Sequence, residues 1–178
     1  MLDRRTADED LLEATRQGDL RAFDQLYTRY ERRLFGYIRR MIGDRDQAED
    51  LLQDVLLTVI RDRSYDPSKG RFSAWLFTVA RNRCLQLRRR AEVRERAPGL
   101  PSEPAADPEQ RVARTQQVRS AMAGLTEAQQ QLLLLKQVGE LTYRELADIH
   151  GVAEGTIKSR LHAATQAFRR RLAELGEG

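Results

Sequence analysis

The chain has 178 residues, of which 40% are apolar and 33% charged, with a formal net charge of +4. This length allows one domain or two small ones. No apolar run approaches the length of a transmembrane span, and a single cysteine, Cys84, excludes an internal disulfide. Leu and Ala dominate over β-branched residues, and apolar residues recur at helical spacing along the chain. We therefore predict an all-α protein. Cys84 is expected to be a buried or bystander thiol.

Charge is distributed unevenly along the chain. Residues 61–96 hold 11 basic and 4 acidic residues, whereas residues 44–59 hold 5 acidic and 1 basic. Such segregation indicates that one surface binds a polyanion and another surface binds a different partner. Binding of a membrane surface by a basic amphipathic helix would also explain the basic segment. The N-terminal segment lacks the apolar core and cleavage site of a signal peptide, so we expect a cytoplasmic protein with no membrane insertion.

Two helices are predicted first in the chain. Thr6 and Glu9 have the spacing of a capping box, which predicts a helix that ends near Gly18. Apolar residues then recur at steps of three and four from Phe23 to Met41, and this predicts a long amphipathic helix whose aromatic residues lie mostly in the core.

A third helix is predicted from about Asp46 to Asp62. Its apolar stripe has helical spacing and consists of Ala48, Leu51, Leu52, Val55, Leu56 and Val59. The opposite side is polar except for one leucine, and it carries Asp46, Asp50, Gln53, Leu57 and Arg61, with Asp54 at its margin.

An aromatic cluster precedes a basic helix in the next segment. The loop of residues 63–71 contains proline and glycine, and Ser73 is expected to cap the helix that follows. Phe72, Trp75 and Phe77 lie just before a run of arginines. Aromatic faces beside cations are typical of single-stranded DNA binding. The alternative, favoured for the aromatic residues taken alone, is that they are core residues.

Four of the five prolines fall in residues 92–108, which we interpret as a flexible linker. It separates two predicted domains, residues 1–91 and 109–178. A Pro-rich extended linker would span on the order of 50 Å, more than one turn of DNA. After it we expect a helix from about Glu109 to Ala123 and a second one after a Thr126–Gln129 capping box. The apolar run 132–135 is expected to support the C-terminal domain.

The segment from Leu141 to His162 predicts a helix-turn-helix. Thr142 and Glu145 have capping-box spacing, and Gly151 stands where the chain leaves the first helix, a position that favours the left-handed conformation. In this motif the second helix enters the major groove, where Lys and Arg donate to base edges. The alternative is that these cations are only the solvent-exposed residues of an ordinary helix and do not bind DNA.

The chain as a whole resembles the small two-domain bacterial sigma factors of the extracytoplasmic-function (ECF) type. The resemblance rests on four segments in order: AFDQLYTRYERRLFGYIRR, DQAEDLLQDVLLTVIRD, FSAWLFTVARNRCLQLRRR and LTYRELADIHGVAEGTIKSRLHAATQAFRRRL. It implies a promoter-specificity subunit without catalytic activity, metal or cofactor, which binds core RNA polymerase and promoter DNA, both duplex and single-stranded, and is held inactive by an anti-sigma partner.

The resemblance also implies roles for three sets of residues. Docking on a coiled coil of the largest polymerase subunit is implied for Asp46, Asp50, Gln53, Asp54 and Leu57. Recognition and melting of the minus-ten element is implied for Lys69, Arg71, Phe72, Trp75, Arg81, Asn82, Arg88, Arg89 and Arg90. Reading of the minus-thirty-five element is implied for Arg144, Glu154, Thr156, Lys158, Ser159, Arg160 and His162.

Two other classes of function compete with this prediction. The first is a conventional helix-turn-helix repressor or activator whose N-terminal half senses a ligand or dimerises. The second is a helical metal-dependent nuclease that uses Asp46, Glu49, Asp50 and Asp54. No histidine accompanies these carboxylates, so they are better explained as a docking surface than as a metal site.

Overall fold

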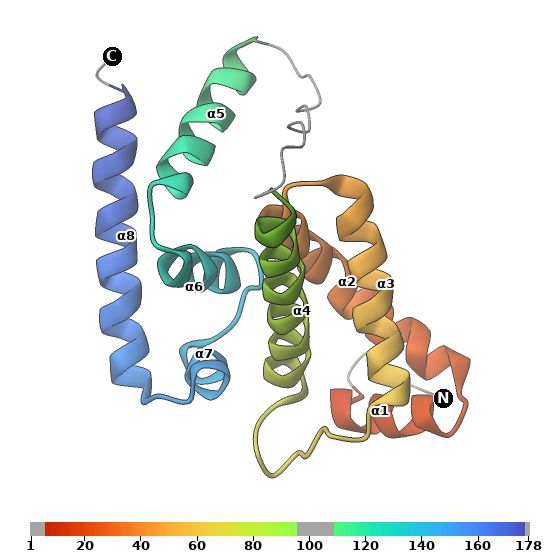
Figure 1. Cartoon of the computed structure of the whole chain (residues 1–178). Coiled ribbons are helices and arrows are strands. Elements are labelled where there is room, and N and C mark those ends of the chain that lie inside the picture. The colour runs from red at the N-terminus through yellow and green to blue at the C-terminus, as the bar shows by residue number, and fades with distance from the viewer. Residues whose placement is uncertain (1–5, 96–108, 177–178) are drawn as a thin grey trace.

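A computed structural model describes residues 6–95 and 109–176 of the chain. These ranges hold eight α-helices and no strand, which confirms the predicted all-α fold (Figure 1). Helices α1–α4 form an N-terminal half and α5–α8 a C-terminal half. Their bounds are α1 Asp8–Arg16, α2 Leu20–Ile42, α3 Arg45–Arg61, α4 Phe72–Glu95, α5 Glu109–Ala123, α6 Glu127–Gln137, α7 Tyr143–His150 and α8 Glu154–Gly176.

The first long helices, α2 and α3, each begin after an aspartate that caps them, although neither cap was predicted. Asp19 caps α2 by accepting from the backbone N–H of Arg21 at 2.9 Å. Gly43 ends α2 with a φ of 87°, a conformation that glycine adopts without steric cost. Asp44 then caps α3 through the N–H of Gln47 at 2.8 Å. Caps of this kind satisfy backbone donors that the helix leaves unpaired.

Two predicted caps are wrong because tertiary contacts take their side chains. Ala7 is the N-cap of α1, without a side-chain hydrogen bond, and the Glu9 carboxylate instead accepts from the Tyr65 hydroxyl at 3.0 Å. Ser73 lies inside α4, is buried, and donates to Glu145 in the C-terminal half.

The N-terminal core forms where α2 packs against α1, α3 and α4. All six residues of the predicted apolar stripe on α3 are buried, which confirms that prediction. Among the aromatic residues of α2, Tyr30 and Tyr37 are buried, whereas Phe23, Tyr27 and Phe35 are partly exposed. Cys84 is also buried, as expected, and burial raises the pKa of its thiol to about 12.

In the C-terminal half, α8 packs against α5, α6 and α7. The predicted capping box of Thr126 and Gln129 is present at the start of α6. The first four residues of the segment assigned as a linker, residues 92–95, belong instead to α4, which continues to Glu95. Residues 96–108 lie outside the part of the chain that the structure describes.

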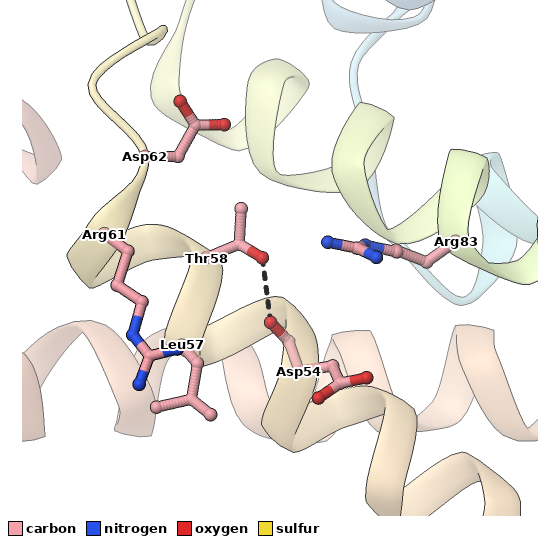
Figure 2. Close-up of a pocket in the computed structure, with 6 residues that line it drawn as sticks. All are labelled: Asp54, Leu57, Thr58, Arg61, Asp62 and Arg83. Carbon is pink, nitrogen blue, oxygen red and sulfur yellow. Dashed lines mark hydrogen bonds between the residues drawn. The ribbon is translucent and has the colours of Figure 1, made fainter.

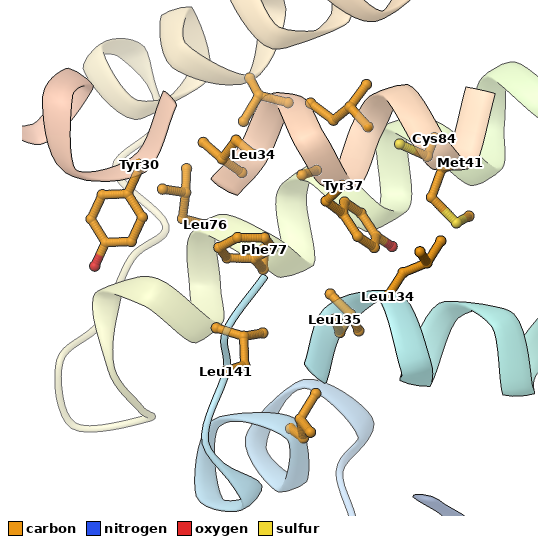
Figure 3. Packing of buried hydrophobic residues seen from close by; sticks show 14 of the residues in the cluster. Tyr30, Leu34, Tyr37, Met41, Leu76, Phe77, Cys84, Leu134, Leu135 and Leu141 are labelled. Carbon is orange, nitrogen blue, oxygen red and sulfur yellow. The ribbon is translucent and has the colours of Figure 1, made fainter. Parts of the chain in front are cut away.

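The two halves share one hydrophobic core. The apolar run 132–135 is buried, as predicted, but it does more than support the C-terminal half. Figure 3 shows Leu134 and Leu135 of α6 beside Tyr37, Met41 and Phe77, and all five belong to a single buried cluster. The halves are therefore packed against each other through side chains that the sequence assigns to separate cores.

Candidate nucleic-acid interface

The helix-turn-helix is formed by α7 and α8. The Thr142 hydroxyl accepts from the backbone N–H of Glu145, whose carboxylate accepts from the N–H of Thr142 at 2.7 Å, so the predicted capping box is present. Gly151 ends α7 in the left-handed conformation with a φ of 61°. Beyond the turn, Ile157 and Leu161 are buried. The buried face of α8 thus fixes which of its side chains point outward.

Two cations near the start of α8 are exposed, on opposite flanks of its buried stripe. Lys158 and Arg160 are exposed, and the Lys158 ammonium lies 5.6 Å from the centroid of the Tyr143 ring. The other predicted minus-thirty-five residues surround them. Arg144, Glu154, Ser159 and His162 are exposed, and Thr156 is half-buried. The structure therefore brings this whole set to one accessible region around the start of α8.

The predicted minus-ten residues are in contrast divided between surface and core. The cations Lys69 and Arg71 of the loop before α4 are exposed. Phe72 is only 1% exposed and packs edge-on against Tyr30, with ring centroids 5.5 Å apart. Trp75 is half-buried beside it. In this structure Phe72 therefore lies in the core and Trp75 lies at its edge, as the alternative prediction of core residues describes.

Farther along α4 the polar residues also differ among themselves. Asn82, Arg89 and Arg90 are exposed. Arg81 and Arg88, which are half-buried, contact side chains of α6. The Arg81 Nε donates to the Gln131 Oε1 at 2.8 Å, and Arg88 forms an ion pair with Glu127 at 3.3 Å. Neither partner was predicted, because no local signal identifies contacts between residues so distant in the chain.

The exposed face of α3 is continuous and mostly acidic. Asp46, Asp50, Gln53 and Asp54 are exposed, as predicted, and Leu57 is 44% exposed. Ile60, which was not predicted to belong to this face, is 37% exposed and extends its apolar part. Its position three residues after Leu57 could have identified it, since residues three apart share a helix face.

A groove of about 420 Å³ runs beside this face. Its lining residues come from α3, the residue that follows it, and α4: Asp54, Leu57, Thr58, Arg61, Asp62 and Arg83 (Figure 2). The Thr58 hydroxyl donates to the backbone carbonyl of Asp54 at 2.8 Å and is thereby fixed toward the helix. The groove links the acidic face of α3 to the basic surface of α4.

Within residues 6–95 and 109–176, no group of three or more His, Cys, Asp or Glu side chains is placed to hold a metal ion. In the same ranges no helix is long and apolar enough to cross a membrane.

Comparisons with known proteins assign both halves to one family. The family model for sigma-70 region 2 matches residues 26–94, and the model for sigma-70 region 4 matches residues 115–168. The chain is 35% identical to the ECF RNA polymerase sigma factor RpoE of Cereibacter sphaeroides, over 86% of this chain and 88% of that protein. It is 33% identical to the ECF sigma factor SigM of Mycobacterium tuberculosis, over 97% of this chain and 88% of that protein.

Solved structures agree with this assignment. The sigma factor RpoE of Bartonella quintana, solved in complex with the anti-sigma factor NepR, is 31% identical and matches with a TM-score of 0.65 over 87% of this chain and 96% of that one. CnrH, solved with the cytosolic domain of CnrY, shares the fold with a TM-score of 0.71 at 21% identity, over 97% of this chain and 98% of that one. The chain therefore belongs to the ECF RNA polymerase sigma factors, which direct promoter-specific initiation of transcription.

Proposed function

We propose that this sigma factor divides its work among three surfaces. The face of α3 docks on the clamp coiled coil of the largest polymerase subunit, the α4 region binds the minus-ten element, and α8 reads the minus-thirty-five element. The observation that carries this proposal is the separation of the three residue sets onto different helices, each with an exposed face of fitting chemistry. We propose that the N-terminal domain extends to the end of α4 at Glu95 and that the C-terminal domain begins with α5 at Glu109.

The minus-thirty-five assignment is supported by the shape of the C-terminal half. A left-handed Gly151 turns the chain so that α8 projects beyond α7. The exposed Lys158 and Arg160 of α8 can each donate to guanine edges, while Ser159 and Thr156 can bind phosphate or base. His162 and Arg144 extend the polar region. This surface fits closed duplex DNA because α8 carries all of it except Arg144, which lies on the preceding helix α7.

The minus-ten assignment is supported by the density of cations around α4. Lys69 and Arg71 flank its start, and Arg89 and Arg90 lie toward its end. Between them the exposed Asn82 carries an amide that can pair with a base edge. Phosphate contacts from these cations would hold a separated strand while unpaired bases are bound.

The docking assignment is supported by the composition of the α3 face. The carboxylates of Asp46, Asp50 and Asp54 precede the exposed Leu57 on the same face of α3. An apolar side chain at the end of a row of charges suits a protein partner, because the apolar contact gives affinity and the charges give orientation.

The sigma factor itself is proposed to lack catalytic activity, since bond formation belongs to the polymerase. We place it in the cytoplasm, where that enzyme works. We also propose an anti-sigma partner for this chain, on the model of the relative solved with NepR.

Run-off transcription with purified core polymerase over a randomised promoter library tests the division of work. Asp50→Ala and Leu57→Ala are expected to reduce transcription by weakening polymerase binding, while binding to a selected minus-thirty-five duplex is retained. Arg160→Ala is expected to weaken binding to that duplex, while binding to core polymerase is retained.

Matched controls come from exposed positions of α2. Asp24→Ala and Leu20→Ala remove the same side-chain types from a helix outside the three surfaces, and both positions are exposed. They should leave transcription unchanged. Equal loss of duplex binding in the α3 and α8 variants would contradict the division, and absence of any transcription with core polymerase would favour a conventional repressor or activator.

A further inference from the structure

Helix α1 contacts both ends of the loop that joins α3 to α4. This loop, residues 62–71, lies outside any helix and carries Lys69 and Arg71 of the proposed minus-ten surface. Helix α1 itself is anchored, because Leu11 and Leu12 are buried and the helix packs against α2 and α3 (Figure 1). The helix is therefore a fixed support beside an irregular segment of the chain.

At the start of the loop, Arg16 of α1 donates through Nη2 to the backbone carbonyl of Asp62. Arg16 is half-buried and is the last residue of α1, and Asp62 is the C-cap of α3. The Asp62 carboxylate in turn accepts from the backbone N–H of Ser64 at 2.7 Å. A cation that binds a carbonyl at a helix C-terminus satisfies an acceptor that the helix leaves unpaired. The point where the chain leaves α3 is thereby tied to α1.

Tyr65 connects α1 to the end of the loop. Its side chain is buried, and its ring packs against Phe72 and Trp75 with centroids 5.7 and 5.5 Å apart. Its hydroxyl lies 3.0 Å from a carboxylate oxygen of Glu9 and 3.2 Å from the carbonyl oxygen of Gly70, so these two acceptors share one proton. Burial and the hydrogen bond to Glu9 raise the pKa of Tyr65, which keeps the hydroxyl a donor.

Within the loop, local hydrogen bonds shape a turn without placing it. The Asp66 carboxylate accepts from the backbone N–H of Ser68 at 2.9 Å and from its hydroxyl at 2.7 Å. The Asp66 carbonyl accepts from the N–H of Lys69 at 3.0 Å, and Pro67 at the second position suits such a turn. All of these bonds join loop residues to one another. The position of Lys69 relative to α4 therefore depends on the contacts at the two ends of the loop.

We propose that Glu9 and Arg16 of α1 are positioning residues, which act through Tyr65 and Asp62 to hold the loop in place beside α4 for minus-ten recognition. This inference rests on the proposed function, because it takes the loop as part of the minus-ten surface. A side chain discriminates between bases only when its donors are held in a fixed geometry. A loop released from α1 leaves the cations of α4 to bind phosphates, so strands still bind but their sequences are distinguished less well.

The test compares two single strands on the holoenzyme formed with purified core polymerase. Both strands are fluorescent and about 20 nucleotides long. One carries the minus-ten element selected by run-off transcription of the randomised library, and the other carries the same bases in scrambled order. The measured quantity is the ratio of the two dissociation constants. A variant that only destabilises the fold lowers the competent fraction of protein, which weakens binding to both strands equally and leaves the ratio unchanged.

Three variants release the loop in different ways. Tyr65→Phe removes the shared donor and keeps the buried ring, Glu9→Ala removes one acceptor of that donor, and Arg16→Ala removes the donor to Asp62. We expect each variant to lower the preference for the selected strand by about fivefold, the effect of one lost hydrogen bond. Binding to a selected minus-thirty-five duplex should not change.

Matched variants separate these hydrogen bonds from general effects of substitution. Glu9→Gln keeps a side-chain amide that can bond to the Tyr65 hydroxyl, and it should keep the wild-type ratio. Tyr27→Phe removes a hydroxyl that bonds to Glu31 within α2, and Arg21→Ala removes an exposed cation of the same helix. Both should also keep the wild-type ratio. If Glu9→Gln lowers the ratio as much as Glu9→Ala does, the role given to Glu9 is overturned.

The outcomes separate this inference from the proposed function. A wild-type ratio in both Tyr65→Phe and Glu9→Ala, or equal weakening toward both strands, would overturn the inference and leave the minus-ten assignment intact. The double variant K69A and R71A tests that assignment, because it removes two exposed cations of the loop. If its holoenzyme bound both strands as the wild type does, the assignment of the loop would be overturned, and the inference with it.

Discussion

The two proposed DNA surfaces differ in how far they depend on the rest of the fold. Around the start of α8, six of the seven assigned side chains are exposed and the seventh, Thr156, is half-buried. Around α4, Phe72 is a core residue, while Arg81 and Arg88 contact α6. A surface carried by the exposed side chains of a helix-turn-helix can act on its own, whereas a surface built into a shared core is coupled to stability and to the packing of the two halves.

The largest expected effect is on stability, at Phe72. Phe72→Ala should lower the free energy of unfolding by about 3–5 kcal/mol, because the ring is buried and packs against Tyr30, Tyr65 and Trp75. Urea denaturation followed by circular dichroism measures it. Phe72→Leu, which keeps most of the buried volume, should cost much less. A cost below about 1 kcal/mol for the alanine variant would show that Phe72 is not part of the core.

A smaller effect, on binding alone, is expected at Arg160. Arg160→Ala should weaken binding to a selected minus-thirty-five duplex by about 1–3 kcal/mol, the value of one good base contact. Because the side chain is exposed, the free energy of unfolding should change by less than about 0.5 kcal/mol. Fluorescence anisotropy and urea denaturation on the same preparation measure the two quantities. A large loss of stability in Arg160→Ala would contradict this prediction, because it would show that Arg160, like Phe72, stabilises the fold.

This contrast matches what the sequence could and could not predict. The Thr142 capping box, the left-handed Gly151 and the outward cations of α8 are determined by residues within a few positions of one another, and they were predicted. The failed caps at Glu9 and Ser73 share a different cause. Each side chain binds a partner far along the chain, Tyr65 or Glu145, and a local pattern carries no information about such contacts.

The same reason explains the missed interface between the halves. The leucines of α6 were correctly predicted to be buried, but periodicity gives no indication of which element covers them. Likewise the arginines of α4 were assigned to DNA from their type and density, whereas their contacts with Gln131 and Glu127 depend on how the halves pack.

Two helix caps of the C-terminal half provide a finer test. Thr142→Ala and Thr126→Ala should each lower the free energy of unfolding by about 0.5–2 kcal/mol, as expected for the loss of an N-cap hydroxyl. They differ in one respect, because Glu145 in the Thr142 box also accepts from Ser73 across the two halves. Thermal and urea unfolding of both variants measure the cost.

A double-mutant cycle with Ser73→Ala resolves that difference. Thr142→Ala and Ser73→Ala should be coupled by about 0.5 kcal/mol or more, since both hydroxyls donate to the same carboxylate. Thr126→Ala should be additive with Ser73→Ala. Coupling of equal size in both cycles would mean that the Ser73 contact does not act through Glu145.

The smallest expected effect is a dependence on pH between 7.5 and 5.5. His150 ends α7 at the contact with α4, and burial lowers its pKa below the ordinary 6.5, helped by the nearby charges of Arg81 and Arg160. A histidine with a lowered pKa stabilises the fold above 6.5 and loses that contribution as pH falls below it. Glu145 also faces this interface, but its pKa is lowered from 4.5 and it stays ionised throughout the range.

His150→Gln is the matched test, because the glutamine keeps a polar side chain without a titrating group. The melting temperature of the wild type should fall more between pH 7.5 and 5.5 than that of this variant, and His162→Gln, at an exposed position of α8, should behave as the wild type does. If the wild type and His150→Gln lose stability in parallel, protonation of His150 does not act on the packing of α7 against α4.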